Sequence, residues 1–178
     1  FKEWTNTKKQ TFDSTYRDEP RIIIPMYDRD KNLIGFQGRS LTHNSVKYIT
    51  VMLEDSAPKI YGLDTIDEKL PVYVVEGPFD STFINNSVAL CGSDGDLGYL
   101  EGSDTILVYD NEPRNREIVG RIERCIDRNQ KVVIWPSNIV EKDINDMVLG
   151  GHDVMSVIKL NTYSGLEAKI KFNTWKKI

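Results

Sequence analysis

Acidic side chains recur where hydrophobic segments of this 178-residue chain come to an end. Glu76 closes one β-branched run, Asp110 closes another, and Glu112 follows two residues later. Asp143 comes shortly after a further run. Carboxylates that lie close together resist ionising at the same time unless cations join them. Oxygen ligands without histidine or cysteine suit Mg²⁺ or Mn²⁺, so these acids predict a site for one of those ions.

An ion of this kind is typical of phosphoryl transfer. Mg²⁺ held by a few carboxylates keeps coordination positions open for phosphate oxygens, and two such ions can stabilise both the attacking and the leaving oxygen. Taken singly, each acid could instead be a solvated loop residue, and Asp143 could be the N-cap of a helix. Asp80 and Asp146 are predicted either to support the ligands from close by or to act within the first turns of helices.

The elements that must position these acids alternate between strand and helix. Four apolar runs, rich in β-branched residues, predict strands that are covered on both faces: 71–76, 87–92, 105–110 and 131–136. This alternation predicts an α/β fold with a parallel sheet, right-handed crossovers and flanking helices. Ligands of such sheets bind beyond the carboxyl ends of the strands, which is where the acids fall.

Two helices are predicted between these strands. Residues 78–86 begin with a proline, as short helices often do. Residues 115–130 form a strongly amphipathic pattern. Its predicted apolar stripe consists of Ile118, Ile122, Cys125, Ile126 and Asn129.

The chain outside this region is more basic. Residues 1–50 carry 9 Lys and Arg against 6 Asp and Glu, residues 51–158 carry 9 against 20, and residues 159–178 carry 5 against 1. An acidic centre that needs cations, flanked by basic segments that could hold a polyanion, is one interpretation, and an ordinary charged surface is the other. The segments 21–28, 33–41 and 46–51 are predicted strands, after an irregular or partly helical lead-in.

No apolar run approaches the length of a membrane span, and no secretory signal is present, so a cytoplasmic protein without membrane contact is expected. Cys91 and Cys125 lie in apolar contexts and are predicted to be buried thiols in a reducing compartment. The sequence begins without methionine and is interpreted as a piece of a longer protein.

The order of these motifs resembles the Toprim domain, which primases, topoisomerases and some nucleases share. The segments "RIIIPMYDRDKNLIGFQGRSL", "VKYI" and "KIYGLD" before the Glu76 strand, and "KDIND" after it, resemble the catalytic core of bacterial and phage replicative primases, including those of T-even-type bacteriophages. This resemblance covers about residues 21–150. It implies three parts: a smaller α+β basic subdomain (1–70), a Toprim metal-binding domain (71–150) and a carboxy-terminal extension (151–178).

The resemblance implies the RNA-polymerising core of a DNA primase, with single-stranded DNA, ribonucleoside triphosphates and a replicative helicase as partners. Glu76, Asp110 and Glu112 would be catalytic and, with Asp143, would hold Mg²⁺ or Mn²⁺. Arg39 and Lys47 match basic positions of the primase core, where they would contact template phosphate or the nucleotide triphosphate. Arg21 is a weaker candidate for the same role.

Some features depart from the primase pattern. Glu112 stands where the family has an aspartate, which puts the metal spacing in doubt. The zinc-binding module of primases is missing, so no zinc is expected in this chain. A metal-dependent Toprim nuclease, a topoisomerase-like enzyme and a non-catalytic module that binds DNA or helicase remain as alternatives.

The carboxy-terminal segment has two interpretations. Residues 154–160 predict a short helix, and the alternation over 168–175 predicts a strand. The segment could fold back to cover the sheet edge or the amino-terminal subdomain. Alternatively, it could be a surface for helicase or for single-stranded DNA, with Phe172 and Trp175 stacking on bases and the lysines meeting phosphates.

Overall fold

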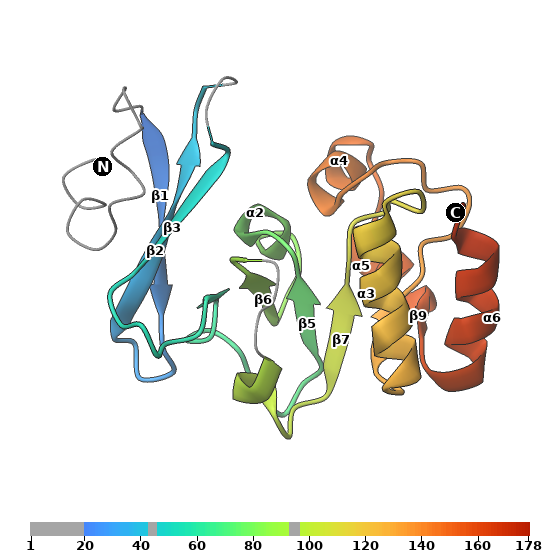
Figure 1. The fold of residues 1–178 in the computed structure, drawn as a ribbon, viewed down its shortest axis with the longest axis horizontal. Helices are drawn as coiled ribbons and strands as arrows, with labels where there is room; N and C mark the ends of the chain where they lie inside the picture. The colour runs from blue at the N-terminus through green and yellow to red at the C-terminus, as the bar shows by residue number, and fades with distance from the viewer. Residues whose placement is uncertain (1–19, 43–45, 93–96) are drawn as a thin grey trace.

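The computed structural model describes residues 20–42, 46–92 and 97–178, which form two sheets (Figure 1). The first sheet is antiparallel in the order β1-β2-β3. Its strands are β1 (Arg21–Tyr27), β2 (Leu33–Ser40) and β3 (Tyr48–Met52). These are the three strands predicted before residue 52. The predicted lead-in lies outside the described residues, apart from Pro20.

The second sheet has the order β4-β6-β5-β7-β8-β9. Its strands are β4 (Ile60–Tyr61), β5 (Val72–Val75), β6 (Ser87–Leu90), β7 (Thr105–Val108), β8 (Lys131–Val133) and β9 (Thr162–Tyr163). The four inner strands are parallel, which confirms the predicted parallel sheet. The two edge strands are antiparallel to their neighbours and were not predicted. The edge strand β4 comes from the segment assigned by sequence to the basic subdomain.

The helices of the described part flank this second sheet (Figure 1). They are α2 (Pro78–Ser81), the 3-10 helix η2 (Leu97–Leu100), α3 (Arg116–Asp127), α4 (Ile144–Leu149), α5 (Val154–Leu160) and α6 (Gly165–Trp175). The helices predicted over 115–130 and 154–160 are confirmed, with α3 somewhat shorter than predicted. The helix predicted over 78–86 is present only as α2, which ends at Ser81. Asn129 was placed wrongly on the apolar stripe of α3, because the helix ends before it and Asn129 is exposed with a φ of 55°.

The strand predicted over 168–175 is wrong, because these residues belong to α6. Ala168, Phe172 and Trp175 are its buried residues, and their spacing of four and three places them on one face of a helix. Ile170, which completes the apparent alternation, is 59% exposed. Burial of one helical stripe against α3 and the sheet thus decides the structure of this segment.

The main core lies between the parallel sheet and its helices. Val72, Val88 and Val132 are fully buried in three of the parallel strands, and Ile122 of α3 packs into the same cluster. Burial of this apolar surface is the main driving force for assembling the sheet. The carboxyl ends of β5 and β7 are thereby held side by side.

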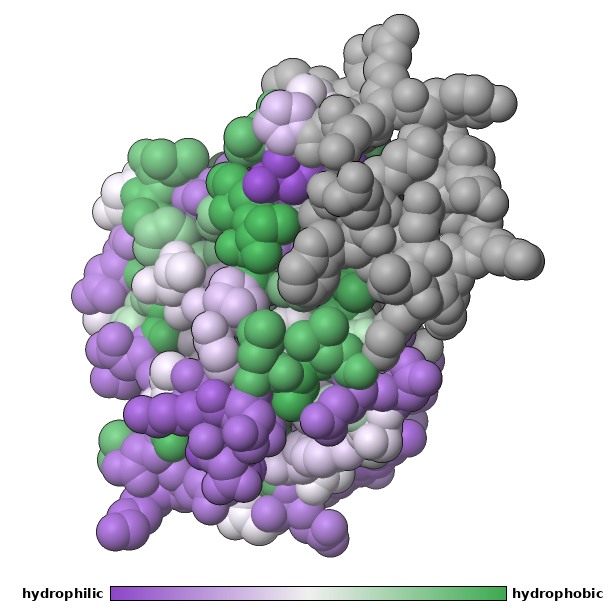
Figure 2. Space-filling model, turned by 90° about the vertical axis from the view of Figure 1, so that its left-hand side faces the viewer, coloured by the Kyte–Doolittle hydropathy of each residue, from purple (hydrophilic) through white to green (hydrophobic). Residues whose placement is uncertain are grey.

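The first sheet turns one side toward the second. Gln37, Arg39, Tyr48 and Thr50 alternate along β2 and β3 and point to this side, as their contacts with the second sheet and α2 show. Phe36, Ile49 and Val51 form a separate apolar cluster. Figure 2 views the molecule from the side of the first sheet, where hydrophobic and hydrophilic residues are interspersed.

Candidate functional site

Glu76 is the first residue after β5, whose four residues are all buried. One carboxylate oxygen of Glu76, Oε1, is buried without a hydrogen-bond partner among the described residues. Burial raises the pKa of Glu76, and the nearby charges of Glu112 and Asp80 add to this effect. A Cβ atom on Gly77 would lie 3.0 Å from Asp80 Oδ2, so glycine at this turn lets α2 bring Asp80 close to the strand end.

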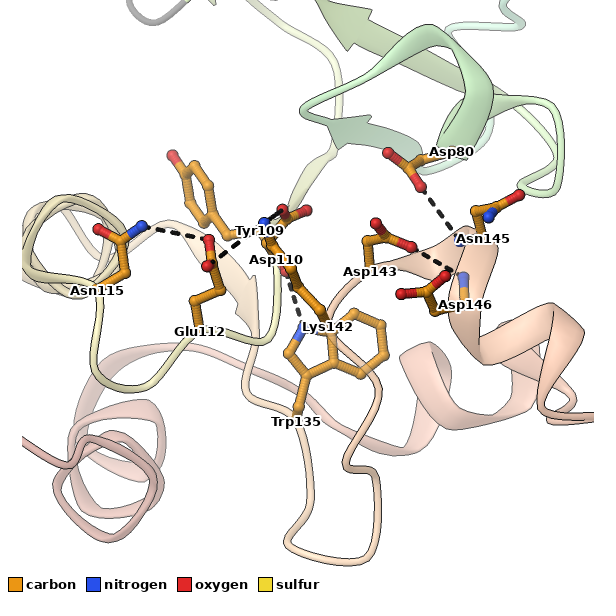
Figure 3. A network of polar contacts seen from close by, with 10 residues as sticks. All are labelled: Asp80, Tyr109, Asp110, Glu112, Asn115, Trp135, Lys142, Asp143, Asn145 and Asp146. Carbon is orange, nitrogen blue, oxygen red and sulfur yellow. Dashed lines mark hydrogen bonds and ion pairs between the residues drawn. The ribbon is translucent and has the colours of Figure 1, made fainter. Parts of the chain in front are cut away.

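Asp110 and Glu112 follow the neighbouring strand, β7 (Figure 3). Burial raises the pKa of Asp110 to about 7, and repulsion from Glu76 and Asp80 acts in the same direction. Lys142 forms ion pairs with both acids. Its Nζ lies 3.4 Å from Glu112 Oε1 and 4.0 Å from Asp110 Oδ2. Its side chain is 55% exposed, so it only partly compensates for the buried negative charge.

Asp143 and Asp80 lie across from each other at the start of α4. Asp143 caps this helix, and its Oδ1 accepts a hydrogen bond of 2.8 Å from the backbone N–H of Asp146. Asp80 Oδ1 accepts a bond of 3.3 Å from the backbone N–H of Asn145. Burial raises the pKa of Asp80 to about 6, with repulsion from Asp143 as the next cause. The predicted N-cap role of Asp143 is thus confirmed. Its charge also acts on the site, since it raises the pKa of Asp80.

The acids gather in one region without converging on one point. In Figure 3 the carboxylates of Asp80, Asp110 and Asp143 face a common region, and Glu112 lies on the other side of Asp110. Within the described ranges, no three His, Cys, Asp or Glu side chains lie close enough together to hold a metal ion as placed. A bound cation would give the buried oxygen of Glu76 a partner and would lower the raised pKa values of the acids. The all-oxygen donor set fits Mg²⁺ or Mn²⁺.

Asn111, between the two acids of the second motif, holds their loop in place. Its Nδ2 donates to the backbone oxygens of Ile139 and Glu141, at 3.0 and 3.1 Å. Its Oδ1 accepts a 2.9 Å hydrogen bond from Nε1 of Trp175 at the end of α6. This role was not predictable from the sequence, because the partners lie 28 to 64 residues away along the chain.

The predicted basic residues Arg39 and Lys47 lie beside Tyr48 on the first sheet, which forms a wall opposite the acids. The Arg39 guanidinium stacks 4.8 Å from the Phe79 ring of α2 and contacts the Tyr48 hydroxyl. Lys47 Nζ lies 5.6 Å from the Tyr48 ring. Both cations oppose the rise in the pKa of Asp80, so they face the acids electrostatically.

Arg21 stands apart from this wall. Its Nη1 donates to the backbone oxygens of Gly38 and Val46 at 3.2 and 2.9 Å, contacts that hold the end of the first sheet together. Its phosphate-binding role stays a prediction.

A cleft of about 410 Å³ separates the two walls. Glu76 and Gly77 line one side, and Gln37, Tyr48 and Thr50 line the other. Arg121 of α3 also lines it, and its charge lowers the pKa of Glu76. Neither Arg121 nor Gln37 was predicted as a site residue, although Gln37 precedes Arg39 by two residues on a predicted strand.

The carboxy-terminal aromatic residues are packed inside the molecule. Phe172 is 2% exposed and Trp175 is 8% exposed, with ring centroids 6.2 Å apart. These two rings are therefore not available to stack on bases. The interpretation in which the segment folds back to cover the sheet edge is confirmed, since β9 pairs with β8 at that edge and α6 packs against α3. Among the described residues, no helix is long and apolar enough to cross a membrane.

No protein-family profile matches the chain. It is 35% identical to the DNA primase of Enterobacteria phage T4 over 186 residues, which cover 99% of this chain and 54% of that protein. It is 26% identical to the DNA primase of Helicobacter pylori strain 26695 over 151 residues, which cover 74% of this chain and 26% of that protein. The chain thus spans about half the length of the phage relative and about a quarter of the bacterial one.

Solved primase structures share the fold. The Aquifex aeolicus primase, with its zinc-binding and RNA polymerase domains, aligns with a TM-score of 0.62 and 22% identity over 85% of this chain and 43% of that chain. The RNA polymerase domain of Mycobacterium tuberculosis primase DnaG, in complex with a double-stranded DNA oligomer with a 6-nucleotide overhang, aligns with a TM-score of 0.65 and 19% identity over 83% of this chain and 55% of that chain. The predicted resemblance to primase catalytic cores and the predicted α/β fold are confirmed.

Proposed function

We propose that this chain is the RNA-polymerising core of a DNA primase, which joins ribonucleotides along a single-stranded DNA template. The observation that carries the proposal is the cleft between the two sheets. Glu76 lines one side, next to the partly buried Asp80 and Asp110 with their raised pKa values, and Tyr48, which Arg39 and Lys47 contact, lines the other. The 35% identity to a phage DNA primase over almost the whole chain supports it. One solved relative is a DnaG primase catalytic domain bound to single-stranded DNA, which supports the choice of template.

Glu76, Asp110, Glu112 and Asp143 would hold Mg²⁺ or Mn²⁺. The bound ions would neutralise charge that develops on the phosphate and pyrophosphate oxygens. Without any ion, the acids already lie near one another in the fold, and their burial strengthens the repulsion between them. Asp80 and Asp146 support this arrangement through the turn after β5 and the first turn of α4.

Arg39 and Lys47 would orient the nucleotide triphosphate or the template phosphates. The planar Arg39 guanidinium is held against Phe79 and Tyr48, so part of its conformational freedom is already lost before a phosphate binds. Arg21 would contribute from the same sheet. We further propose that the chain acts in the cytoplasm, where replicating DNA lies, with a replicative helicase as its partner.

The test is elongation of a preformed RNA primer annealed to single-stranded DNA, because this bypasses initiation. We expect Mg²⁺-dependent addition of ribonucleotides that follows the template sequence and is lost in Asp110→Asn. A shortened template without ribonucleotide addition would identify a nuclease. DNA binding without either reaction, in folded and metal-loaded protein, would identify a non-catalytic module.

A further inference from the structure

Gln37 places an unpaired hydrogen-bond acceptor in the cleft. The side chain is 4% exposed, and its Oε1 has no hydrogen-bond partner among the described residues. It lines the same cleft as Glu76, whose Oε1 is the other buried oxygen without a partner. A buried carbonyl oxygen without a hydrogen bond costs free energy, so its presence at a ligand cleft points to a ligand that supplies the donor.

The orientation of the Gln37 amide follows from its neighbour on β3. Thr50 Oγ1 lies 3.2 Å from the backbone oxygen of Cys91, which can only accept, so the hydroxyl must donate to it. The same hydroxyl oxygen, 3.1 Å from Gln37 Nε2, must then accept from the amide nitrogen. This chain of bonds turns Nε2 toward Thr50 and leaves Oε1 as the free group.

The location of the cleft limits what the ligand can be. Glu76 and Gly77 belong to both the acid site and the cleft. A nucleotide whose phosphates lie at the acids would therefore have its nucleoside within reach of the cleft. The volume of about 410 Å³ suits a small ligand, and the Tyr48 ring offers an aromatic surface.

Resting on the proposed function, we propose that Gln37 is a specificity residue for the nucleotide. Its Oε1 accepts a hydrogen bond from a donor of the nucleoside, either a ribose hydroxyl or an N–H group of the base. Thr50 is a positioning residue, because it holds the amide in the orientation that presents this acceptor.

Titration calorimetry with Mg²⁺ and eight triphosphates tests this proposal. The set comprises the four ribonucleoside triphosphates and their four 2′-deoxy counterparts. Gln37→Met keeps the size of the side chain and removes the acceptor. Thr50→Val keeps the shape and releases the amide. Gln130→Met is the matched control, because this glutamine follows α3 outside the cleft.

We expect Gln37→Met to reduce the preference among these triphosphates by about three- to tenfold, which is the usual effect of losing one hydrogen bond. Loss of preference for ribose over deoxyribose would identify the 2′-hydroxyl as the donor. Loss of preference among bases would identify the base. Thr50→Val should shift the same preference by a smaller factor, and Gln130→Met should leave it unchanged.

Two results would count against the proposal, and they distinguish failure of the Gln37 role from failure of the proposed function. If the wild-type chain binds triphosphates and both cleft variants keep its preferences, the role of Gln37 is wrong and the proposed function stands. If the wild-type chain binds none of the eight, both ideas fail together. Thermal melting of each variant shows that the comparison is made between folded proteins.

Discussion

Replacing Asp110 with asparagine should stabilise the metal-free protein at neutral and alkaline pH. Burial, reinforced by Glu76 and Asp80, raises the pKa of Asp110 from 3.8 to about 7. A rise of this size corresponds to about 4 kcal/mol between the protonated and the ionised forms, as an upper bound. The side chain is 21% exposed and loses its contact with Lys142 in the variant, which reduces the expected gain to about 2 kcal/mol.

The pH dependence follows from the direction of the shift. Between pH 4 and 7 the folded protein holds a proton on Asp110 that the unfolded chain has released, so folding stability falls as the pH rises through this window. Asp110→Asn removes this dependence. The melting temperature of the variant should equal that of the wild type near pH 4 and exceed it by about 4–8 °C at pH 8.

The assay is thermal unfolding in a chelating buffer at a series of pH values, repeated with Mg²⁺. If Mg²⁺ binds the folded wild type at these acids, as proposed, it should raise the melting temperature of the wild type more than that of the variant. Asp104→Asn is the control, since Asp104 is half exposed and paired with Lys131 at 2.8 Å. If Asp110→Asn melts at or below the wild-type temperature at pH 8 without metal, the electrostatic reasoning is refuted.

Three further predictions concern other parts of the molecule. Lys47→Ala should weaken triphosphate binding in calorimetry and shift the melting temperature by no more than about 2 °C, because Lys47 is exposed beside Tyr48, which lines the cleft, and lies outside the core; unfolding with unchanged affinity would contradict this. Phe172→Ala should cost about 3–5 kcal/mol in chemical denaturation and leave the salt dependence of single-stranded DNA binding unchanged; a stable variant with a flatter salt dependence would favour a DNA-binding surface. Burial raises the pKa of Cys91 to about 12 and that of Cys125 above its ordinary value, so both thiols should react with a thiol reagent at pH 8 only after unfolding; rapid labelling of native protein would contradict this.

The parallel sheet was predictable because its strands are covered on both faces. Such strands carry continuous apolar runs, as β5 and β7 do, and parallel pairing then places the acids after them at one edge. The amphipathic stripe of α3 was equally plain. The carboxy-terminal segment was misread because an alternating pattern and a helical pattern overlap over 168–175, and only packing against α3 distinguishes them.

The polar groups around the acids were not predictable from spacing. Asn111 acts through Trp175, which lies 64 residues further along the chain. The Gln37 amide is hydrogen-bonded to Thr50, its partner across the strand pair β2–β3, so the orientation of the amide depends on the register of that pairing. Such roles depend on which distant residues the fold brings together, whereas the acids could be found because each follows a recognisable strand.

The most direct test of the acid site is titration of the chain with Mn²⁺, compared with the double variant Asp110→Asn, Glu112→Gln. We expect saturable binding to the wild type that weakens at least about tenfold in the double variant, because two of the four proposed carboxylate ligands become neutral amides. Thermal melting should show that the double variant is folded. Mn²⁺ affinity that is unchanged in the folded double variant would contradict a cation site at these carboxylates.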